Sequence, residues 1–152
     1  MTDFAERYGP WAIVAGASKG LGAAFATGSS RPRRQLILAA RRSEPLVALA
    51  DRLPTEAAAV VADLATDDGL ESVLAAAANR EVGLVVANAA YSPIGSFTRM
   101  SLDEPLRALD LNCRATLHLA HHFLPAMAQR RRGGFVIDVF SRRVAGSPPI
   151  TV

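Results

Sequence analysis

At residues 11–22 the chain reads Trp11-Ala12-Ile13-Val14-Ala15-Gly16-Ala17-Ser18-Lys19-Gly20-Leu21-Gly22. The first five residues form a short apolar run, which is typical of a buried parallel strand. The turn after it has the spacing G-x-x-x-G-x-G, which differs from the G-x-G-x-x-G fingerprint of many dinucleotide-binding folds. Bare glycine backbone lets a pyrophosphate approach the next helix N-terminus, where free N–H groups and the helix dipole favour negative charge. The stretch therefore predicts a phosphate-binding turn; the alternative is a tight strand-to-helix corner.

Similar apolar runs recur at residues 35–40, 57–62, 83–87 and 134–140, with helix-period stretches between them. Strict alternation of strand and helix predicts a parallel sheet with right-handed crossovers, because a helix must carry the chain back between parallel strands. We therefore expect one α/β domain over residues 1–152, a Rossmann-type doubly wound parallel sheet of about five strands in the order 3-2-1-4-5. Its ligand crevice is expected at the carboxyl ends of the strands, where the first and fourth strands diverge.

Polar residues predict where two of the crossover helices begin. Thr66 precedes two aspartates and an apolar helical pattern, which indicates a capped, acidic first turn. Ser101 is followed three residues later by Glu104, the spacing of a capping box. From there the pattern predicts a long helix, interrupted near Asp110 and ending around Arg130 before two glycines.

The first crossover helix is expected to be short or frayed. Its second half reads Thr27-Gly28-Ser29-Ser30-Arg31-Pro32. Within a helix, glycine costs about 1 kcal/mol and proline about 3 kcal/mol relative to alanine.

Bulk composition narrows the possible classes of protein. The 152 residues are 50% hydrophobic and 20% charged, with a formal charge of +3, as in a globular domain with an aliphatic core. The arginines lie in several small clusters, which argues against a nucleic-acid partner. Cys113 is the only cysteine, so neither an intrachain disulfide nor a Cys-based metal site can form. With no apolar run long enough to span a bilayer and no secretory signal, we expect a soluble, cytoplasmic protein.

Three histidines, His118, His121 and His122, lie within about one helical turn of each other. They could suggest a metal pair, but no acidic or Cys partner lies near them in the sequence. We interpret this stretch as a surface or interface helix and expect no metal site.

The glycine turn and four later landmarks together resemble the short-chain dehydrogenase/reductase (SDR) family. The family's glycine motif has the spacing seen here, usually with Thr where Ala15 stands. The later landmarks follow in the family's order: Asp63-Leu64 after the third strand, Asn88-Ala89-Ala90 after the fourth, Asn112 in the long helix and Ser141 at the end of the fifth strand. The resemblance covers essentially the whole chain.

The resemblance implies two sets of site residues and no metal ligands. The implied cofactor-binding residues are Gly16, Ser18, Lys19, Gly20, Leu21, Gly22, Arg41, Asp63, Leu64, Asn88 and Ala89. The implied catalytic residues are Asn112 and Ser141, although Arg142-Arg143 delays the Ala-Gly that should follow the serine by about two positions.

Each landmark also has a simpler structural interpretation. Asn88 could only bond loop backbone at the strand ends, and Asp63 could only start a helix. Asn112 could be a satisfied core amide, and Ser141 an ordinary turn residue.

The end of the second strand bears on the choice of cofactor. In dinucleotide-binding folds, an acidic residue about 20 positions after the glycine turn binds the ribose 2′-hydroxyl of NAD, whereas Arg accommodates the 2′-phosphate of NADP. Here that place holds Ala40-Arg41-Arg42, and Lys19 adds a positive charge. The sequence therefore predicts NADP(H) rather than NAD(H); the alternative is that Arg41 and Arg42 are ordinary solvated surface charges.

By resemblance, the protein is an NADP(H)-dependent oxidoreductase that transfers hydride between the cofactor and a small-molecule carbonyl or alcohol substrate. Family members carry Tyr-x-x-x-Lys about a dozen residues after the serine, with Tyr as general acid/base. That motif is not found in the 152 residues, where Tyr8 and Tyr91 are the only tyrosines. We therefore expect a C-terminally incomplete, truncated copy that is poorly stable and without normal turnover. The alternative is a non-enzymatic NADP(H)-binding or interaction module. The family's use of the helix around Asn112 as a subunit contact implies a homo-oligomer.

Overall fold

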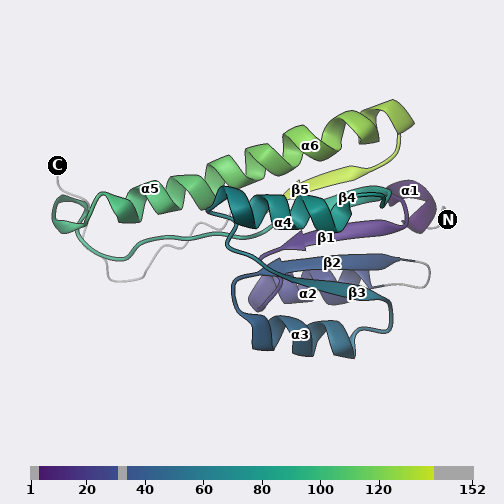
Figure 1. Ribbon diagram of the computed structural model, residues 1–152, viewed down its shortest axis with the longest axis horizontal. Helices are drawn as coiled ribbons and strands as arrows, with labels where there is room; N and C mark the ends of the chain where they lie inside the picture. Colours follow the sequence, from purple (N-terminus) through teal and green to yellow (C-terminus); the bar gives the residue numbers. More distant parts are fainter. Residues whose placement is uncertain (1–3, 31–33, 139–152) are drawn as a thin grey trace.

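A computed structural model describes residues 4–30 and 34–138 and confirms the predicted sheet. Its five strands are all parallel and run in the order β3-β2-β1-β4-β5 (Figure 1). The strands are β1 (Trp11–Ala15), β2 (Gln35–Ala40), β3 (Ala57–Val61), β4 (Val82–Ala87) and β5 (Gly134–Ile137). The helices are α1 (Phe4–Tyr8), α2 (Gly20–Ser29), α3 (Ser43–Arg52), α4 (Asp67–Ala77), the 3₁₀ turn η1 (Phe97–Arg99), α5 (Asp103–Leu109), the π-helix η2 (Asp110–Arg114) and α6 (Ala115–Arg130).

The strand boundaries agree closely with the apolar runs in the sequence. Strands β1 and β2 match the predicted runs, β3 ends one residue earlier at Val61, and β4 begins one residue earlier at Val82. Strand β5 ends at Ile137, and residues 139–140 of the predicted run lie outside the described part of the chain.

The sheet register brings the carboxyl ends of four strands to one edge. Ala15 at the end of β1 pairs with Ala39 of β2 on one side and Ala87 of β4 on the other. Ala87 in turn pairs with Ile137, the last residue of β5. Residues that directly follow these strands are therefore held close together, although they lie far apart in the sequence.

Helices cover both faces of the sheet, and alternate strand residues point to each face. One face packs against α4 and α6 through Ile13, Ala15, Ile37, Val85, Leu70, Val73, Leu119 and Phe123. The other face packs against α2 and α3 through Ala12, Val14, Leu36, Leu38, Val86, Ala26, Leu46 and Leu49. Burying a Val, Leu or Ile side chain contributes about 1.5–3 kcal/mol, so this aliphatic core holds the strand ends in place.

The first crossover helix ends within the stretch that the sequence marks as unfavourable for a helix. Helix α2 runs through Thr27 and Gly28 to Ser29. The Thr27 hydroxyl donates to the Ala23 carbonyl at 2.9 Å, and the Ser30 N–H bonds to the carbonyls of Ala26 and Thr27. These bonds close the last turn, and the helix ends at Ser29 before Pro32.

Two helix starts behave differently. The Thr66 hydroxyl accepts from the Gly69 N–H at 3.1 Å and caps α4 as predicted. The predicted capping box is absent at α5, because Leu102 occupies the N-cap position without a side-chain bond. Glu104 instead accepts a hydrogen bond from the Tyr91 hydroxyl.

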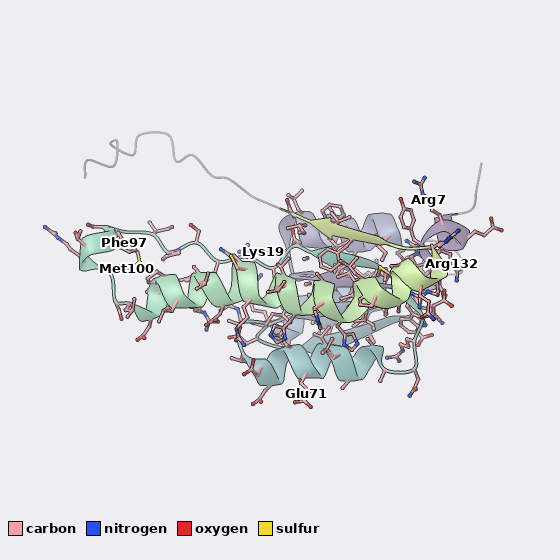
Figure 2. The ribbon with its side chains drawn as sticks, turned by 90° about the horizontal axis from the view of Figure 1, so that it is seen from above. Arg7, Lys19, Glu71, Phe97, Met100 and Arg132 are labelled. Atoms are coloured by element: carbon pink, nitrogen blue, oxygen red, sulfur yellow. The ribbon has the colours of Figure 1, made fainter. Side chains whose placement is uncertain are left out.

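The long helix has the interruption that the sequence predicts near Asp110. Helices α5 and α6 are joined by the π-helix η2, and helical backbone continues through both junctions. Figure 1 shows α5 continuing the line of α6 beyond the sheet, and Figure 2 shows Phe97 and Met100 at the outer end of this projection. Helix α5 has no buried residue, whereas α6 buries Leu119 and Phe123 against the sheet. The long helix ends at Arg130, and Arg131 adopts the left-handed conformation with φ of 51°.

Candidate functional site

A cleft of about 890 Å³ opens at the carboxyl ends of the strands. Nine of the predicted cofactor-binding residues line it: Gly16, Ser18, Lys19, Gly20, Leu21, Arg41, Leu64, Asn88 and Ala89. Gly22 and Asp63 lie beside the lining rather than in it. Ala40, Arg42, Ala62, Ala90, Leu111 and Asp138 complete the wall.

Close packing explains two of the glycines in the turn after β1. Gly16 has φ of +77°, and a Cβ there would lie 2.7 Å from the Ala89 Cα. A Cβ on Gly22 would lie 2.1 Å from the Gly16 carbonyl oxygen and 2.5 Å from the Asn88 Nδ2. The Gly16 N–H donates to the Ala39 carbonyl at 2.8 Å, which ties the turn to β2. Gly22 therefore does not line the cleft, but its lack of a side chain lets α2 pack closely against the turn.

The N-terminus of α2 faces the cleft without a side-chain cap. Lys19 occupies the N-cap position in extended backbone and makes no capping bond, unlike Thr66 at α4. Gly20 has φ of +58°, and a Cβ there would meet nothing within 4 Å. The first N–H groups of a helix have no intrahelical partner, and together with the helix dipole they favour an anion. This end of the cleft therefore suits a phosphate group.

Asn88 holds two strand ends together and also lines the cleft. Its Nδ2 donates to the carbonyl oxygens of Gly16 at 3.0 Å and Ala15 at 3.4 Å. Its backbone N–H donates to the Ala15 carbonyl at 3.2 Å. Asn88 therefore bonds backbone at the strand ends, as its simpler interpretation expects, and it also lines the cleft.

Positive charge dominates the wall at the end of β2. Of the lining residues that the structure describes, Lys19, Arg41 and Arg42 carry positive charge and Asp138 carries negative charge. All three cations are exposed, and Arg42 donates to the Ser18 hydroxyl at 3.3 Å. This bond links the end of β2 to the glycine turn. The cleft therefore offers two positive side chains after β2 and a third beside the uncapped helix.

Asp63 is held beside the cleft between two donors. Its Oδ1 accepts from the Ala65 N–H at 3.1 Å, and its Oδ2 accepts from Arg107 at 2.6 Å. Burial by itself raises the pKa of the Asp63 carboxyl, but the Arg107 hydrogen bond, the Ala65 N–H and the charges of Arg107 and Arg41 together lower that pKa below its ordinary value. Asp63 is therefore a firmly ionised carboxylate.

Asn112 lies in the π-helix η2 and binds the backbone of one residue with both ends of its amide. Its Oδ1 accepts from the Tyr91 N–H at 2.8 Å, and its Nδ2 donates to the Tyr91 carbonyl at 2.8 Å. Asn112 is exposed and not part of the apolar core, and its neighbour Leu111 lines the cleft. Ser141, the other predicted catalytic residue, lies outside the described residues. Asn112 thus fixes the loop after β4 to the long helix.

Tyr91 is engaged by an acidic partner. Its hydroxyl donates to Glu104, and that hydrogen bond is the main reason that the pKa of Tyr91 is raised above its ordinary value. A general acid/base works best with a pKa near the working pH. Tyr91 therefore does not have the electrostatic setting of a proton-transfer residue.

The His cluster lies on α6, where His118, His121 and His122 are exposed. Within residues 4–30 and 34–138, no group of three or more His, Cys, Asp or Glu side chains is arranged to hold a metal ion. Over the same described ranges, no helix combines the length and apolar character needed to cross a membrane.

Two features of the site were not predicted from the sequence. Asp138 lines the cleft at the end of β5, three positions before Ser141, and its N–H donates to the Ala87 carbonyl at 3.1 Å. The ion pair between Asp63 and Arg107 joins residues 44 positions apart. The one signal for the first was the charge of Asp138 within the predicted apolar run 134–140, and the sequence carried none for the second.

Comparisons with known proteins agree with this geometry. A family model described as short chain dehydrogenase matches residues 10–150. The chain is similar to the 7beta-hydroxysteroid dehydrogenase of Clostridium sardiniense, with 28% identity over 138 residues that cover 88% of this chain and 53% of the relative. It is also similar to the inactive hydroxysteroid dehydrogenase-like protein 1 of Homo sapiens, with 32% identity over 143 residues that cover 88% of this chain and 43% of the relative.

Solved structures of short-chain dehydrogenases are also similar to this chain. A short-chain dehydrogenase from Sphingobium yanoikuyae in complex with NADPH superimposes with a TM-score of 0.77 and 29% identity, over 84% of this chain and 52% of that one. The chain spans about half the length of the curated relatives it matches. From the matched family model, the sheet order and the residues of the cleft, we conclude that this chain belongs to the short chain dehydrogenase family.

Proposed function

We propose that this chain binds NADP(H) in the cleft and forms the cofactor-binding part of an oxidoreductase that acts on a small-molecule carbonyl or alcohol. The observation that carries the proposal is the clustering of Lys19, Arg41 and Arg42 on a cleft that also contains an uncapped helix N-terminus. The similar Sphingobium yanoikuyae structure, a complex with NADPH, supports the same cofactor. When bound, the nicotinamide would supply or accept the hydride.

Each part of the cleft has a proposed role in holding the dinucleotide. Gly16, Gly20 and the N-terminus of α2 would hold the pyrophosphate, with Ser18, Leu21 and Gly22 maintaining the turn. Arg41 and Lys19 would bind the 2′-phosphate, and Arg42 would keep the glycine turn in place through Ser18. Asp63 and Leu64 would contact the adenine, and Asn88 and Ala89 would form the floor of the cleft.

The same lining explains why the 2′-phosphate should matter. Positions 39–43 at the end of β2 carry no carboxylate that could bind a ribose 2′-hydroxyl. A charge-assisted bond between a guanidinium and a phosphate is roughly twice as strong as a neutral one. The preference for NADP(H) over NAD(H) is therefore expected to come from the adenosine half of the cofactor.

In the whole protein, Asn112 and Ser141 are proposed to serve the reaction rather than cofactor binding. Asn112 would hold the loop after β4 through the Tyr91 backbone, and Ser141 would orient the substrate oxygen. A second candidate is a non-enzymatic NADP(H)-binding module. The raised pKa of Tyr91 and its bond to Glu104 are compatible with that candidate, because this tyrosine of the described residues is not set up to transfer a proton.

The 2′-phosphate can be tested alone with two small probes. Adenosine 2′,5′-bisphosphate and 5′-AMP differ only in the 2′-phosphate, so their affinities isolate its contribution. We expect isothermal titration calorimetry to give at least about tenfold tighter binding for the bisphosphate, because a hydrogen bond to a charged group contributes about 1.5–3 kcal/mol. Equal affinities would leave dinucleotide binding possible but would overturn the assignment of NADP(H).

A further inference from the structure

The turn between β3 and α4 is tied to the long helix by an ion pair. Arg107 of α5 donates to the Asp63 carboxylate at 2.6 Å. The side chains are only 34% and 31% exposed, so the pair is partly shielded from water. Shielding makes such a contact stronger than an ordinary surface ion pair. The adenine end of the proposed cofactor site is thus fixed to a helix that projects beyond the sheet (Figure 1).

A second arginine holds the same turn without touching Asp63. Arg114 of η2 donates to the Ala65 carbonyl at 2.8 Å and forms ion pairs with Asp67 and Asp110. The turn therefore has two anchors on the long helix, of which Arg107 contacts the carboxylate beside the cleft. This arrangement provides a matched pair of positions for experiment.

The Asp63 carboxylate keeps one fixed orientation and still has capacity to accept another hydrogen bond. Its Oδ1 is held by the Ala65 N–H and its Oδ2 by Arg107. An ionised carboxylate can accept about four hydrogen bonds, so acceptor positions remain on both oxygens. The residues on either side, Ala62 and Leu64, both line the cleft. Asp63 therefore lies between two residues of the cleft wall, with its carboxylate held by two donors.

We propose that Arg107 is a positioning residue that makes the cleft selective for a 6-aminopurine, by holding the Asp63 carboxylate in the orientation that accepts the exocyclic amino group. This inference rests on the proposed function and assigns its base selectivity to the ion pair. A 6-amino group donates hydrogen bonds to the carboxylate, whereas the 6-oxo group of hypoxanthine presents an acceptor that the carboxylate repels. Without Arg107, the carboxylate can rotate, and ordering it again on binding costs conformational entropy.

The test compares the affinity of the chain for NADPH and for its analogue with hypoxanthine in place of adenine. We expect the unmodified chain to favour NADPH by at least about tenfold, the usual worth of a hydrogen bond to a charged group. Arg107→Met should bring the ratio to within about twofold of unity, and Arg107→Lys should restore part of it. Asp63→Asn, a nearly isosteric change, should also lower the ratio. Arg114→Met should weaken both ligands equally and leave the ratio unchanged.

The ratio of the affinity for NADPH to the affinity for the hypoxanthine analogue distinguishes a positioning role of Arg107 from a merely structural one. General loosening of the turn would weaken the binding of both ligands together and leave this ratio unchanged. An unchanged ratio in Arg107→Met would overturn the inference, as would an equal fall of the ratio in Arg114→Met. Equal binding of both ligands by the unmodified chain would also overturn it, while leaving the proposed function intact. If the unmodified chain binds neither NADPH nor adenosine 2′,5′-bisphosphate, the proposed function fails and the inference fails with it.

Discussion

Replacing Gly22 by alanine is expected to destabilise the protein by about 3 kcal/mol, the upper part of the usual range for overpacking, and to abolish NADPH binding. The added Cβ would lie 2.1 Å from the Gly16 carbonyl oxygen and 2.5 Å from the Asn88 Nδ2. The nearer of these atoms belongs to backbone that cannot move without breaking the turn. Helix α2 must therefore shift away from the sheet, which displaces its N-terminus from the cleft. Urea unfolding and titration with NADPH measure the two effects.

Gly28→Ala is the matched control on the same helix. A Cβ at Gly28 would meet nothing within 4 Å. Because alanine is favoured over glycine in a helix interior by about 0.5–1 kcal/mol, this variant should be slightly more stable and should bind NADPH normally. If Gly22→Ala matched the control in both stability and binding, the close approach of α2 to the turn would not be what positions the phosphate site.

Charge reversal at Arg41 is expected to lower the affinity for NADPH by about 100-fold, because Arg41→Asp replaces a charge-assisted bond to the 2′-phosphate with repulsion. Binding of NADH should change little, since a carboxylate at this place can accept from the ribose 2′-hydroxyl. Arg41 is exposed and lines the cleft, so the substitution should not disturb the core. Calorimetric titrations of both cofactors, at low and at physiological salt, give the comparison.

Arg52→Asp provides the control for net charge alone. Arg52 is exposed at the end of α3, where it donates to the Ala48 carbonyl, and it is not part of the cleft wall. The Arg52→Asp variant changes the net charge by the same amount as Arg41→Asp, but outside the site. It should lower the affinity for NADPH by less than about threefold, as expected for a screened charge. Equal losses in the two variants would mean that overall charge, rather than a contact from Arg41, attracts the cofactor.

Local signals were sufficient to predict most of the fold. The runs at β1 and β2 end at Gly16 and Arg41, where a glycine and a charge break the apolar pattern, and the limits of both runs match the structure. The interruption at Asp110 was visible as a break in the helical pattern and is the π-helix η2. The end of α2 was harder to predict, because intrinsic propensity makes Gly28 unfavourable. Packing of Ala26 and the Thr27 hydroxyl bond extend that helix to Ser29.

The candidate site was predictable where it depends on strand ends and unpredictable where it depends on pairing across the fold. Lys19 and Arg41 follow β1 and β2, and parallel strands in register bring such residues together. The partners of Asp63 and Asn112 could not be found this way. Arg107 and Tyr91 lie 44 and 21 positions from them, and the meeting depends on where the long helix crosses the loops after β3 and β4.

Hydrogen–deuterium exchange of the 152-residue chain, with and without saturating NADPH, tests most directly whether this cleft is the cofactor site. Backbone N–H groups that bind phosphate or become covered by the dinucleotide exchange more slowly. We predict slower exchange in peptides covering residues 16–22, 40–42 and 62–65, and no change in α6 at residues 118–130, which do not line the cleft. Protection confined to other segments, or no protection at a concentration where calorimetry detects binding, would contradict the assignment of the cleft.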